Sequence, residues 1–209
     1  MDKERPGLEA AFSLRDAEDA RRLYRDWADT YDTEFAAATG YRSPRVVARA
    51  LADAGGTGPV LDIGAGTGLV GEELSALGIG PVDGTDLSPE MLAVAEEKGV
   101  YARTFVADIT ERLPVEDGAY AGAVSAGTFT LGHVGPAALD EVVRVLRPGG
   151  LLAIAVNRAH WEQADFAAAF DALADRLQPP EIREHGIFEG EGGAHAGDTF
   201  FLVTARRGF

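Results

Sequence analysis

The chain of 209 residues contains no cysteine and has few basic side chains. Without a thiol, disulfide bonds, cysteine nucleophiles and thiolate metal sites are excluded. The 19 lysine and arginine residues are outnumbered by 34 aspartate and glutamate residues, so the net charge is −15. An acidic surface repels phosphate backbones, and because no basic stripe offsets that charge, we expect no nucleic-acid partner. The four histidines show no paired spacing such as H-E-x-x-H, so we expect no metal site.

Long hydrophobic segments are also missing. The longest aliphatic run, residues 151–156, is far too short to cross a bilayer, and the first residues lead into no apolar stretch. We therefore expect a cytoplasmic protein with no membrane segment. Hydrophobic residues make up 46% of the chain and charged residues 25%, as in an ordinary globular protein, so we expect one domain over residues 1–209.

The first part of the chain has a helical pattern. Tyr24, Trp27, Tyr31 and Phe35 are spaced as i, i+3, i+7 and i+11, which places them on one face of a single predicted helix. A second helix is predicted after Ser43, because Ser followed by Pro is a favourable cap and first turn.

Strands and helices alternate in the rest of the chain. This alternation implies right-handed crossovers and a doubly wound, Rossmann-like α/β fold, with a seven-stranded, mostly parallel sheet and helices on both faces. Residues 1–55 would form a helical cap and residues 56–209 the Rossmann-like core. The glycine-rich segment 184–198 is compatible with a flap near a site or with a solvated hairpin connection. The expected strands are residues 60–63, 82–86, 103–107, 120–125, 151–156, 182–188 and 199–205.

A glycine-rich loop, DIGAGTG at residues 62–68, follows the first expected strand. In doubly wound sheets ligands bind beyond the carboxyl ends of the strands, and glycines there let the backbone approach a ligand closely. The spacing is G-x-G-x-G, and Leu69 stands where the dinucleotide fingerprint needs its third glycine. No Gly-Lys-Ser/Thr follows, which excludes a Walker loop. The spacing disfavours an NAD(P)-dependent oxidoreductase, which we keep as an alternative.

Two aspartates follow the next expected strands. Asp86 lies 20 residues beyond Gly66, where a carboxylate can accept both hydroxyl hydrogens of a ribose; alternatively, it helps to cap the helix that begins near Ser88. Asp108 could accept from an adenine amino group while Ile109 covers the ring, or it could cap a turn at the following threonine.

Four motifs stand in a recognisable order: VLDIGAGTG at 60–68, GTDLSPEM at 84–91, AD at 107–108 and RVLRPGG at 144–150. In this order and spacing they resemble the class I S-adenosylmethionine (SAM)-dependent methyltransferases. The resemblance covers roughly residues 27–157.

A narrower resemblance rests on WADTYD at 27–32, GYRSP at 40–44 and GTFTLGHV at 127–134. These segments are similar to the methyltransferase-like proteins of the Williams–Beuren syndrome region family. The resemblance implies no particular substrate.

The family resemblance implies SAM as the cofactor and a set of residues around it. The glycine loop would hold the cofactor, with Asp86 on its ribose; residues after the second and third strands would surround the adenine. Residues after the fourth strand would lie near the methionine part, and the N-terminal helix would bring two side chains toward the methionyl carboxylate. In chain order, the implied residues are Tyr31, Arg42, Asp62, Gly64, Ala65, Gly66, Gly68, Asp86, Leu87, Met91, Asp108, Ile109, Ser125, Ala126 and Gly127.

Methyl transfer is an in-line displacement, so positioning can supply much of the catalysis and a base is needed only when the acceptor loses a proton. His133 follows the fourth strand and is the candidate base; alternatively, it packs or hydrogen-bonds at the start of the next helix. On charge grounds we expect a small acceptor that is not strongly anionic. A module that has the SAM-binding fold but no catalytic activity is a second alternative, and the oligomeric state stays open.

Overall fold

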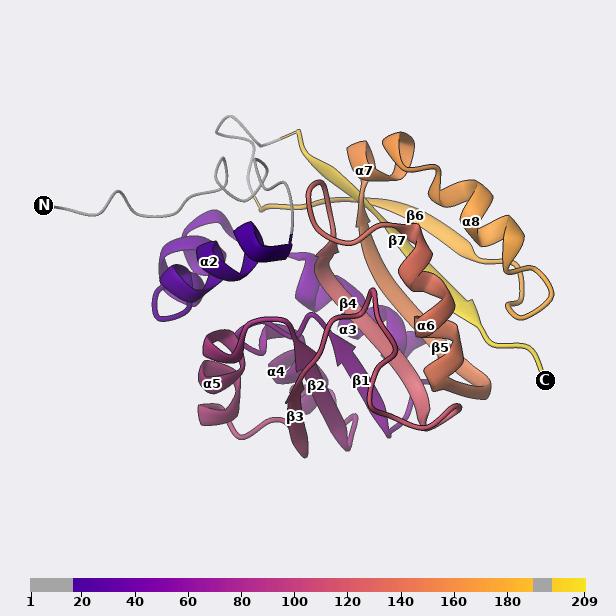
Figure 1. Cartoon of the computed structure of the whole chain (residues 1–209), viewed down its shortest axis with the longest axis horizontal. Coiled ribbons are helices and arrows are strands. Elements are labelled where there is room, and N and C mark those ends of the chain that lie inside the picture. Colours follow the sequence, from indigo (N-terminus) through magenta and orange to yellow (C-terminus); the bar gives the residue numbers. More distant parts are fainter. Residues whose placement is uncertain (1–16, 190–196) are drawn as a thin grey trace, which may run out of the picture.

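The computed structural model describes residues 17–189 and 197–209, and these form a seven-stranded sheet with helices on both faces (Figure 1). The strands are β1 (Val60–Ile63), β2 (Val82–Asp86), β3 (Arg103–Val106), β4 (Tyr120–Phe129), β5 (Leu146–Asn157), β6 (Glu181–Gly186) and β7 (Thr199–Arg206). Their spatial order is β3-β2-β1-β4-β5-β7-β6. Neighbours are parallel except for the two pairs that include β7. The predicted doubly wound, mostly parallel sheet is confirmed.

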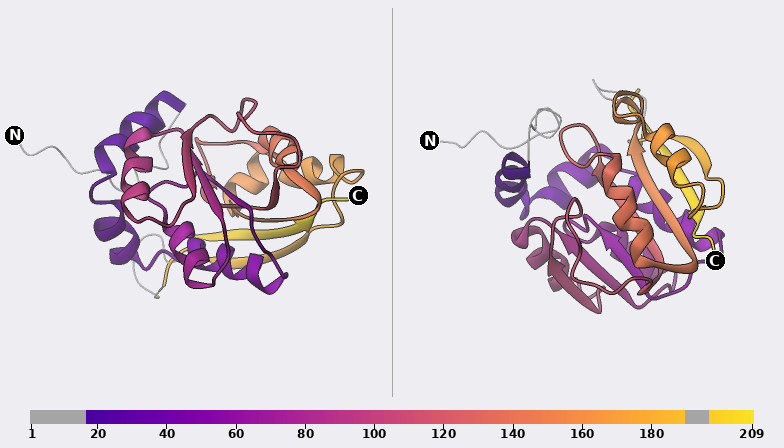
Figure 2. Two further views of the ribbon diagram at one scale, coloured as in Figure 1. Left: turned by 90° about the horizontal axis from the view of Figure 1, so that it is seen from below. Right: turned by 45° about the vertical axis from the view of Figure 1, so that its right-hand side comes forward.

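Helices cover the sheet in two layers (Figure 2). The α-helices are α2 (Ala17–Trp27), α3 (Ser43–Asp53), α4 (Leu69–Ala76), α5 (Pro89–Glu97), α6 (Leu139–Val145), α7 (Arg158–Gln163) and α8 (Phe166–Ala172); η1 (Tyr31–Ala37) is a π-helix and η2 (Pro136–Ala138) a 3-10 turn. One face of the sheet packs against α3 and α4, and α5 flanks β2 and β3. The other face packs against α6, α7 and α8.

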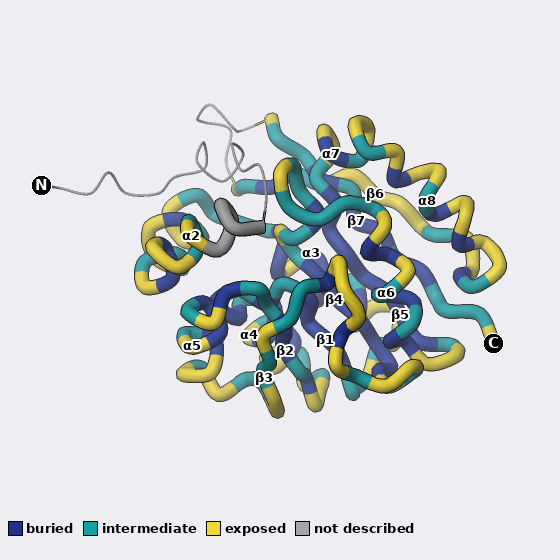
Figure 3. The backbone as a smooth tube through the Cα atoms, in the orientation of Figure 1, coloured by how far each residue is buried: buried dark blue, intermediate teal, exposed yellow. Residues whose placement is uncertain are grey.

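The central strands are buried on both faces because both are covered by helices. All four residues of β1 are buried, and so are residues 151–156 of β5. In Figure 3 these strands are dark blue, whereas the outer turns of the surrounding helices are yellow. The core therefore holds the middle of the sheet rigidly and leaves the strand ends free to carry a site.

The N-terminal segment differs from its prediction. The single helix expected through Tyr24 and Phe35 is wrong, because α2 ends at Trp27 and the π-helix η1 begins at Tyr31. The aromatic rings nevertheless stay together: the centroids of Trp27 and Tyr31 are 5.1 Å apart, and those of Tyr31 and Phe35 are 4.9 Å apart. After the break, Asp32 accepts from Thr67 Oγ1 at 2.5 Å and forms an ion pair with Lys98 at the end of α5. These tertiary contacts hold η1 against the glycine loop. The helical spacing of residues in the sequence cannot predict such long-range contacts.

Several element boundaries also differ from the prediction. β4 continues past 125 to Phe129 through a register shift, and β5 begins at Leu146 rather than at 151. The short helix α7 was not predicted; Asn157 caps it by accepting from His160 N–H at 3.2 Å. Ser43 is the first residue of α3 rather than its cap, whereas Ser88 caps α5 by accepting from Met91 N–H at 3.2 Å.

Parts of two predicted features, residues 1–16 of the cap and 190–196 of the glycine-rich segment, lie outside the described residues. Within residues 17–189 and 197–209, no helix is long and apolar enough to cross a membrane. The same residues contain no group of three or more metal-binding side chains placed to hold an ion.

Candidate functional site: a cofactor cavity and an aromatic side cavity

A large cavity opens at the carboxyl ends of β1, β2 and β4. The strand order reverses between β1 and β4, and such a switch point is where doubly wound folds bind ligands. The N-terminal segment closes the cavity from the opposite side with the rings of Tyr24, Tyr31 and Tyr41. In Figure 1 this segment, in indigo, lies beyond the strand ends and next to α5.

The glycine loop forms the floor of the cavity. Gly64, Gly66 and Gly68 have φ angles of +68°, +54° and +94°, which only glycine adopts readily. The N–H groups of Gly64 and Ala65 both donate to the carbonyl oxygen of Thr85, at 2.8 and 2.9 Å, and so hold the loop against β2.

Two of these glycines face different surroundings. A Cβ added to Gly64 would lie 1.9 Å from Thr128 Oγ1, so the loop packs too closely on β4 for any side chain. A Cβ added to Gly66 would meet no atom of the described residues within 4 Å, and Gly66 lines the cavity. The loop is thus tight against the sheet at one glycine and open to a ligand at the next.

Asp86 lies at the end of β2 and lines the cavity. Its Oδ2 accepts from Gly66 N–H at 2.8 Å and its Oδ1 from Ser88 N–H at 2.9 Å, so it supports both the glycine loop and the start of α5. Burial raises the pKa of this carboxyl, and the backbone donors of Ser88, Gly66 and Leu87 partly oppose the shift. Each carboxylate oxygen has two lone pairs and can also accept from a ligand hydroxyl. Both interpretations of Asp86, helix capping and ribose binding, are compatible with this geometry.

Asp108 and Ile109 line the same cavity from the loop after β3. Oδ1 of Asp108 accepts from the backbone N–H of Thr110 at 2.9 Å and from its hydroxyl at 2.6 Å. The turn-capping role is therefore present in the structure, and adenine binding through this carboxylate stays a prediction.

Asp62 lies beneath the loop and does not line the cavity. Its side chain is fully buried; Oδ2 accepts from the Tyr101 hydroxyl at 2.7 Å, whereas Oδ1 has no hydrogen-bond partner among the described residues. Burial raises the pKa of Asp62 to about 7, although the Tyr101 hydrogen bond lowers it in part. This carboxylate is placed to support the loop.

Neighbouring residues in the second half of β4 have different surroundings. Ser125 is fully buried and donates to the carbonyl oxygen of Ile63 at 2.7 Å, so it joins β4 to β1 and does not line the cavity. Ala126 and Gly127 do line it. A Cβ on Gly127 would lie 2.9 Å from the Tyr41 hydroxyl, so this glycine lets the N-terminal segment close over the site.

Arg42 lies against β6 rather than in the cofactor cavity. Its Nη1 lies 4.0 Å from where a Cβ of Gly186 would be, and its charge helps to lower the pKa of His185, after burial. Arg42 and three other predicted residues lie outside the cavity wall: Asp62, Gly68 and Ser125. The predicted residues that do line it are Tyr31, Gly64, Ala65, Gly66, Asp86, Leu87, Met91, Asp108, Ile109, Ala126, Gly127 and the candidate base His133.

Sequence reasoning missed the contribution of Tyr24 and Tyr41 to the cavity wall. The helical spacing of the sequence predicts only that Tyr24 lies on a helix face, and Tyr41 is part of the GYRSP motif at 40–44 without a predicted role. The available signal was the concentration of tyrosines in a segment expected to cover the cofactor. Burial raises the pKa of both hydroxyls, that of Tyr41 to about 12, so both stay protonated at neutral pH.

A second cavity adjoins the first and shares Tyr24, Tyr31, Tyr41, Gly127 and His133 with it. Its other walls are mainly aromatic rings and aliphatic side chains from α2, η1, β4, β5, β7 and the segment after β6, with three polar side chains, Ser43, Thr130 and Asn157.

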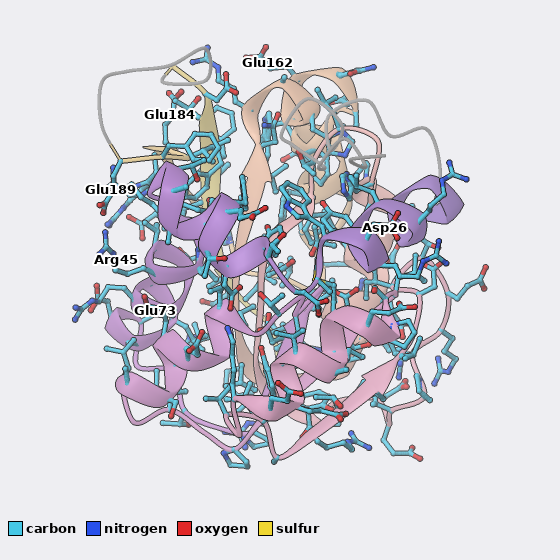
Figure 4. All side chains as sticks on the ribbon, turned by 90° about the vertical axis from the view of Figure 1, so that its left-hand side faces the viewer. Asp26, Arg45, Glu73, Glu162, Glu184 and Glu189 are labelled. Carbon is cyan, nitrogen blue, oxygen red and sulfur yellow. The ribbon has the colours of Figure 1, made fainter. Side chains whose placement is uncertain are left out.

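The segment after β6 is joined to the loop before α3, which brings Phe188 into the second cavity. Arg42 N–H donates to the Ile187 carbonyl oxygen at 2.9 Å, and Glu189 N–H to that of Gly40, also at 2.9 Å. Arg45 of α3 forms an ion pair with Glu189, and Figure 4 labels both at the same edge of the molecule.

Comparisons with known proteins agree with this geometry. Residues 60–150 match the family model described as a methyltransferase domain. Human methyltransferase-like protein 27 is 32% identical over 191 residues, which cover 89% of this chain and 75% of that protein. A demethylmenaquinone methyltransferase of Beutenbergia cavernae is 37% identical over 147 residues, or 68% of this chain and 59% of that protein.

A solved structure from Methanococcus maripaludis, assigned as a SAM-dependent methyltransferase, superposes with a TM-score of 0.63 at 18% identity. The match covers 100% of this chain and 98% of that one, and it supports the fold alone. The identity to the human relative, the strand order and the glycine loop together identify the family. This chain belongs to the class I SAM-dependent methyltransferases.

Proposed function

We propose that this enzyme transfers the methyl group of SAM to a small-molecule acceptor, with SAM in the large cavity and the acceptor in the aromatic cavity beside it. The observation that carries the acceptor assignment is the shared wall: five residues line both cavities, so a molecule in the second would face a cofactor in the first. A side cavity enclosed by rings suits a small molecule better than a macromolecular surface. The relative named demethylmenaquinone methyltransferase is in keeping with a small-molecule acceptor.

The charges of the large cavity fit SAM. Asp86 and Asp108 line it, and none of its described lining residues is a lysine or an arginine. Such a wall favours a cofactor with a positively charged sulfonium and disfavours the pyrophosphate of NAD(P). When bound, SAM supplies an electrophilic methyl group. We propose that Gly64, Ala65, Gly66 and Asp86 hold its amino-acid and ribose parts, with Leu87, Met91, Asp108 and Ile109 around its adenine.

The cofactor assignment is tested by titrating the purified protein with SAM and with NAD by isothermal titration calorimetry. We expect SAM to bind and NAD not to. Replacing Asp86 with alanine is expected to weaken SAM binding by about 1–3 kcal/mol, which is about 5- to 150-fold, because the ribose hydroxyls lose a charged acceptor. Asp83→Ala is the matched control, since Asp83 lies on the same strand but pairs with Arg103 and Tyr120 away from the cavity.

Binding of NAD without SAM would contradict the proposed function. Equal SAM affinity in wild type and Asp86→Ala would remove Asp86 from the site. The acceptor class is tested with methyl-labelled SAM and a cell extract: we expect label in the small-molecule fraction after ultrafiltration. Label confined to protein or nucleic acid would overturn a small-molecule acceptor.

A further inference from the structure

The aromatic cavity has no charged residue among its described lining residues. Its polar side chains are Ser43, Thr130, Asn157, His133 and the tyrosine hydroxyls. An ionised molecule placed there would lose its hydration without gaining a countercharge, which is strongly unfavourable. The walls therefore favour a neutral, largely apolar molecule.

The rings of this cavity also pack on one another. Phe35 lies at the centre of the group, with centroid distances of 5.2 Å to Trp27, 4.9 Å to Tyr31 and 5.2 Å to Tyr41. Faces engaged in this way cannot all turn toward one cation, as an aromatic cage for an ammonium group requires. A flat molecule that lies along the ring walls suits the arrangement better.

One hydrogen-bonded pair lies on the boundary between the two cavities. The Tyr24 hydroxyl is 2.8 Å from His133 Nε2, and His133 Nδ1 is 3.0 Å from the carbonyl oxygen of Leu131. A carbonyl oxygen only accepts, so Nδ1 carries the hydrogen of the neutral imidazole, and Nε2 is left with a lone pair. Tyr24 must then donate its hydrogen to Nε2, which leaves the lone pairs of its own oxygen available.

We propose that the aromatic cavity binds a neutral, planar, hydroxyl-bearing acceptor and that Tyr24 and His133 together receive the hydroxyl proton during O-methylation. This inference rests on the proposed function, and it specifies the acceptor class and the proton route. Both residues line both cavities, so the pair lies at the boundary that a hydroxyl in the second cavity would share with a cofactor in the first.

The methyl transfer and the proton transfer conserve atoms and charge. The acceptor oxygen forms a bond to the methyl carbon as the carbon–sulfur bond breaks, and that bonding pair stays on sulfur. The acceptor O–H proton passes to the Tyr24 oxygen while the Tyr24 hydrogen passes to His133 Nε2. The products are a methyl ether, a neutral thioether and an imidazolium whose Nδ1–H still donates to Leu131.

Several ionisable groups of the described residues act on this pair. Tyr24 on α2 and His160 on α7 face His133, and Tyr41 and the Asp86 carboxylate act on Tyr24. Burial, and to a smaller extent His160, lowers the pKa of His133 below its ordinary value of 6.5, against the opposing hydrogen bond to Leu131. The neutral, proton-accepting form therefore predominates at neutral pH, and turnover should fall only as the pH drops below about 6.5.

The experiment uses 2-naphthol, 1-naphthol and 4-phenylphenol as neutral phenol probes, with 2-naphthoate and a naphthyl trimethylammonium ion as charged analogues. Calorimetry with the full chain saturated with S-adenosylhomocysteine measures binding, and methyl-labelled SAM measures transfer. We expect a neutral phenol to bind at least about tenfold more tightly than either ion and to be methylated on oxygen. Tyr24→Phe and His133→Gln should each lower kcat by about 100-fold, within the range for a general base, with KM changed less than about threefold.

Tyr120→Phe is the control, because it removes a tyrosine hydroxyl that also makes hydrogen bonds, to Asp83 and Arg103, at the other end of β4. It should leave kcat unchanged. The acid limb of the wild-type pH profile should disappear in His133→Gln, and SAM affinity should stay within about twofold in the variants.

Each contrary outcome has a distinct meaning. Tighter binding of a charged analogue, or no methylation of any of the three phenols by protein that binds SAM, overturns the acceptor class and leaves the proposed function intact. Unchanged kcat in Tyr24→Phe, or an acid limb that persists in His133→Gln, overturns the proton route. Failure of the wild-type protein to bind SAM overturns the proposed function itself.

Discussion

Gly64→Ala is expected to destabilise the protein by about 2–5 kcal/mol, whereas Gly66→Ala is expected to weaken SAM binding. The first estimate combines the unfavourable positive φ with overpacking against a neighbour. The Cβ of residue 64 would lie 1.9 Å from Thr128 Oγ1 and 3.0 Å from Thr128 Cβ. Thr128 cannot rotate away freely, because it is β-branched and donates to the Ile63 carbonyl oxygen at 3.1 Å.

Chemical denaturation measures the loss, and Thr128→Ala in the Gly64→Ala background should restore part of it by removing the hydroxyl from the contact. A Gly64→Ala protein as stable as wild type would show that the loop does not pack on β4 in this way.

The effect at Gly66 is expected on affinity, because the added methyl group would project into open space at the cavity wall. We expect SAM to bind at least about tenfold more weakly, or about 1.4 kcal/mol, since the cofactor would meet an extra methyl group. Gly78→Ala is the matched control: Gly78 has φ +70° against +54° for Gly66, and its Cβ would also meet nothing within 4 Å. Gly78 does not line the cavity, so both variants should lose similar stability and only Gly66→Ala should lose affinity. Equal SAM affinity in the two variants would contradict the placement of the cofactor over Gly66.

Asp62 is expected to make the protein less stable as the pH rises from about 4 to about 7. Its pKa is about 7 in the folded protein against an ordinary value of 3.8, so the folded state binds more protons between these values. The contribution of Asp62 to the free energy of unfolding is fully present below about pH 4. It is lost as the pH rises through the folded pKa, and above that pKa the free energy of unfolding no longer changes because of this group. The difference of about 3 pKa units corresponds to about 4 kcal/mol as an upper bound.

The measurement compares urea denaturation of wild type and Asp62→Asn from pH 4 to pH 8. Asp86, whose pKa is also raised, adds to the slope, whereas Asp117 and Glu141, whose pKa values are lowered by Arg144, change the stability only below their ordinary pKa values of 3.8 and 4.5 and so contribute little over most of this range. The difference between the two proteins isolates Asp62: Asp62→Asn should gain stability relative to wild type as the pH rises. Tyr101→Phe should raise the Asp62 pKa further, because it removes the hydrogen bond that lowers it. Parallel pH profiles for wild type and Asp62→Asn would contradict this account.

The architecture and the cofactor loop could be predicted because their signals are local. Strand and helix periodicities recur over short windows, and Gly64, Gly66 and Asp86 stand at spacings set by one βαβ unit. Local sequence patterns were insufficient to predict the surroundings of the residues in β4. Ser125 and Ala126 are neighbours, yet Ser125 donates a hydrogen bond to β1 and Ala126 lines the cavity. The face of a strand is decided by its register with its partners, which the sequence of one strand does not contain.

The N-terminal segment shows the same limit. Tyr41 and Arg42 are adjacent, but Tyr41 lines both cavities whereas Arg42 lies against β6. The isolated bridge between Tyr41 and Phe188 sets this orientation, and it joins residues far apart in the chain. Tyr24 and His133, which are 109 positions apart, meet only because α2 and the loop after β4 converge at the cavity.

The sequence by itself determined the doubly wound fold, the methyltransferase family and the position of the glycine loop, because these depend on local propensity, periodicity and motif spacing. Only the tertiary structure decided which loop glycine packs on β4 and which is open to the cavity, placed Asp62 beneath the loop, and brought Tyr24 to His133 beside an aromatic cavity whose described lining residues carry no charge. Those features depend on contacts between distant segments, whose geometry follows from packing and strand register across the whole sheet.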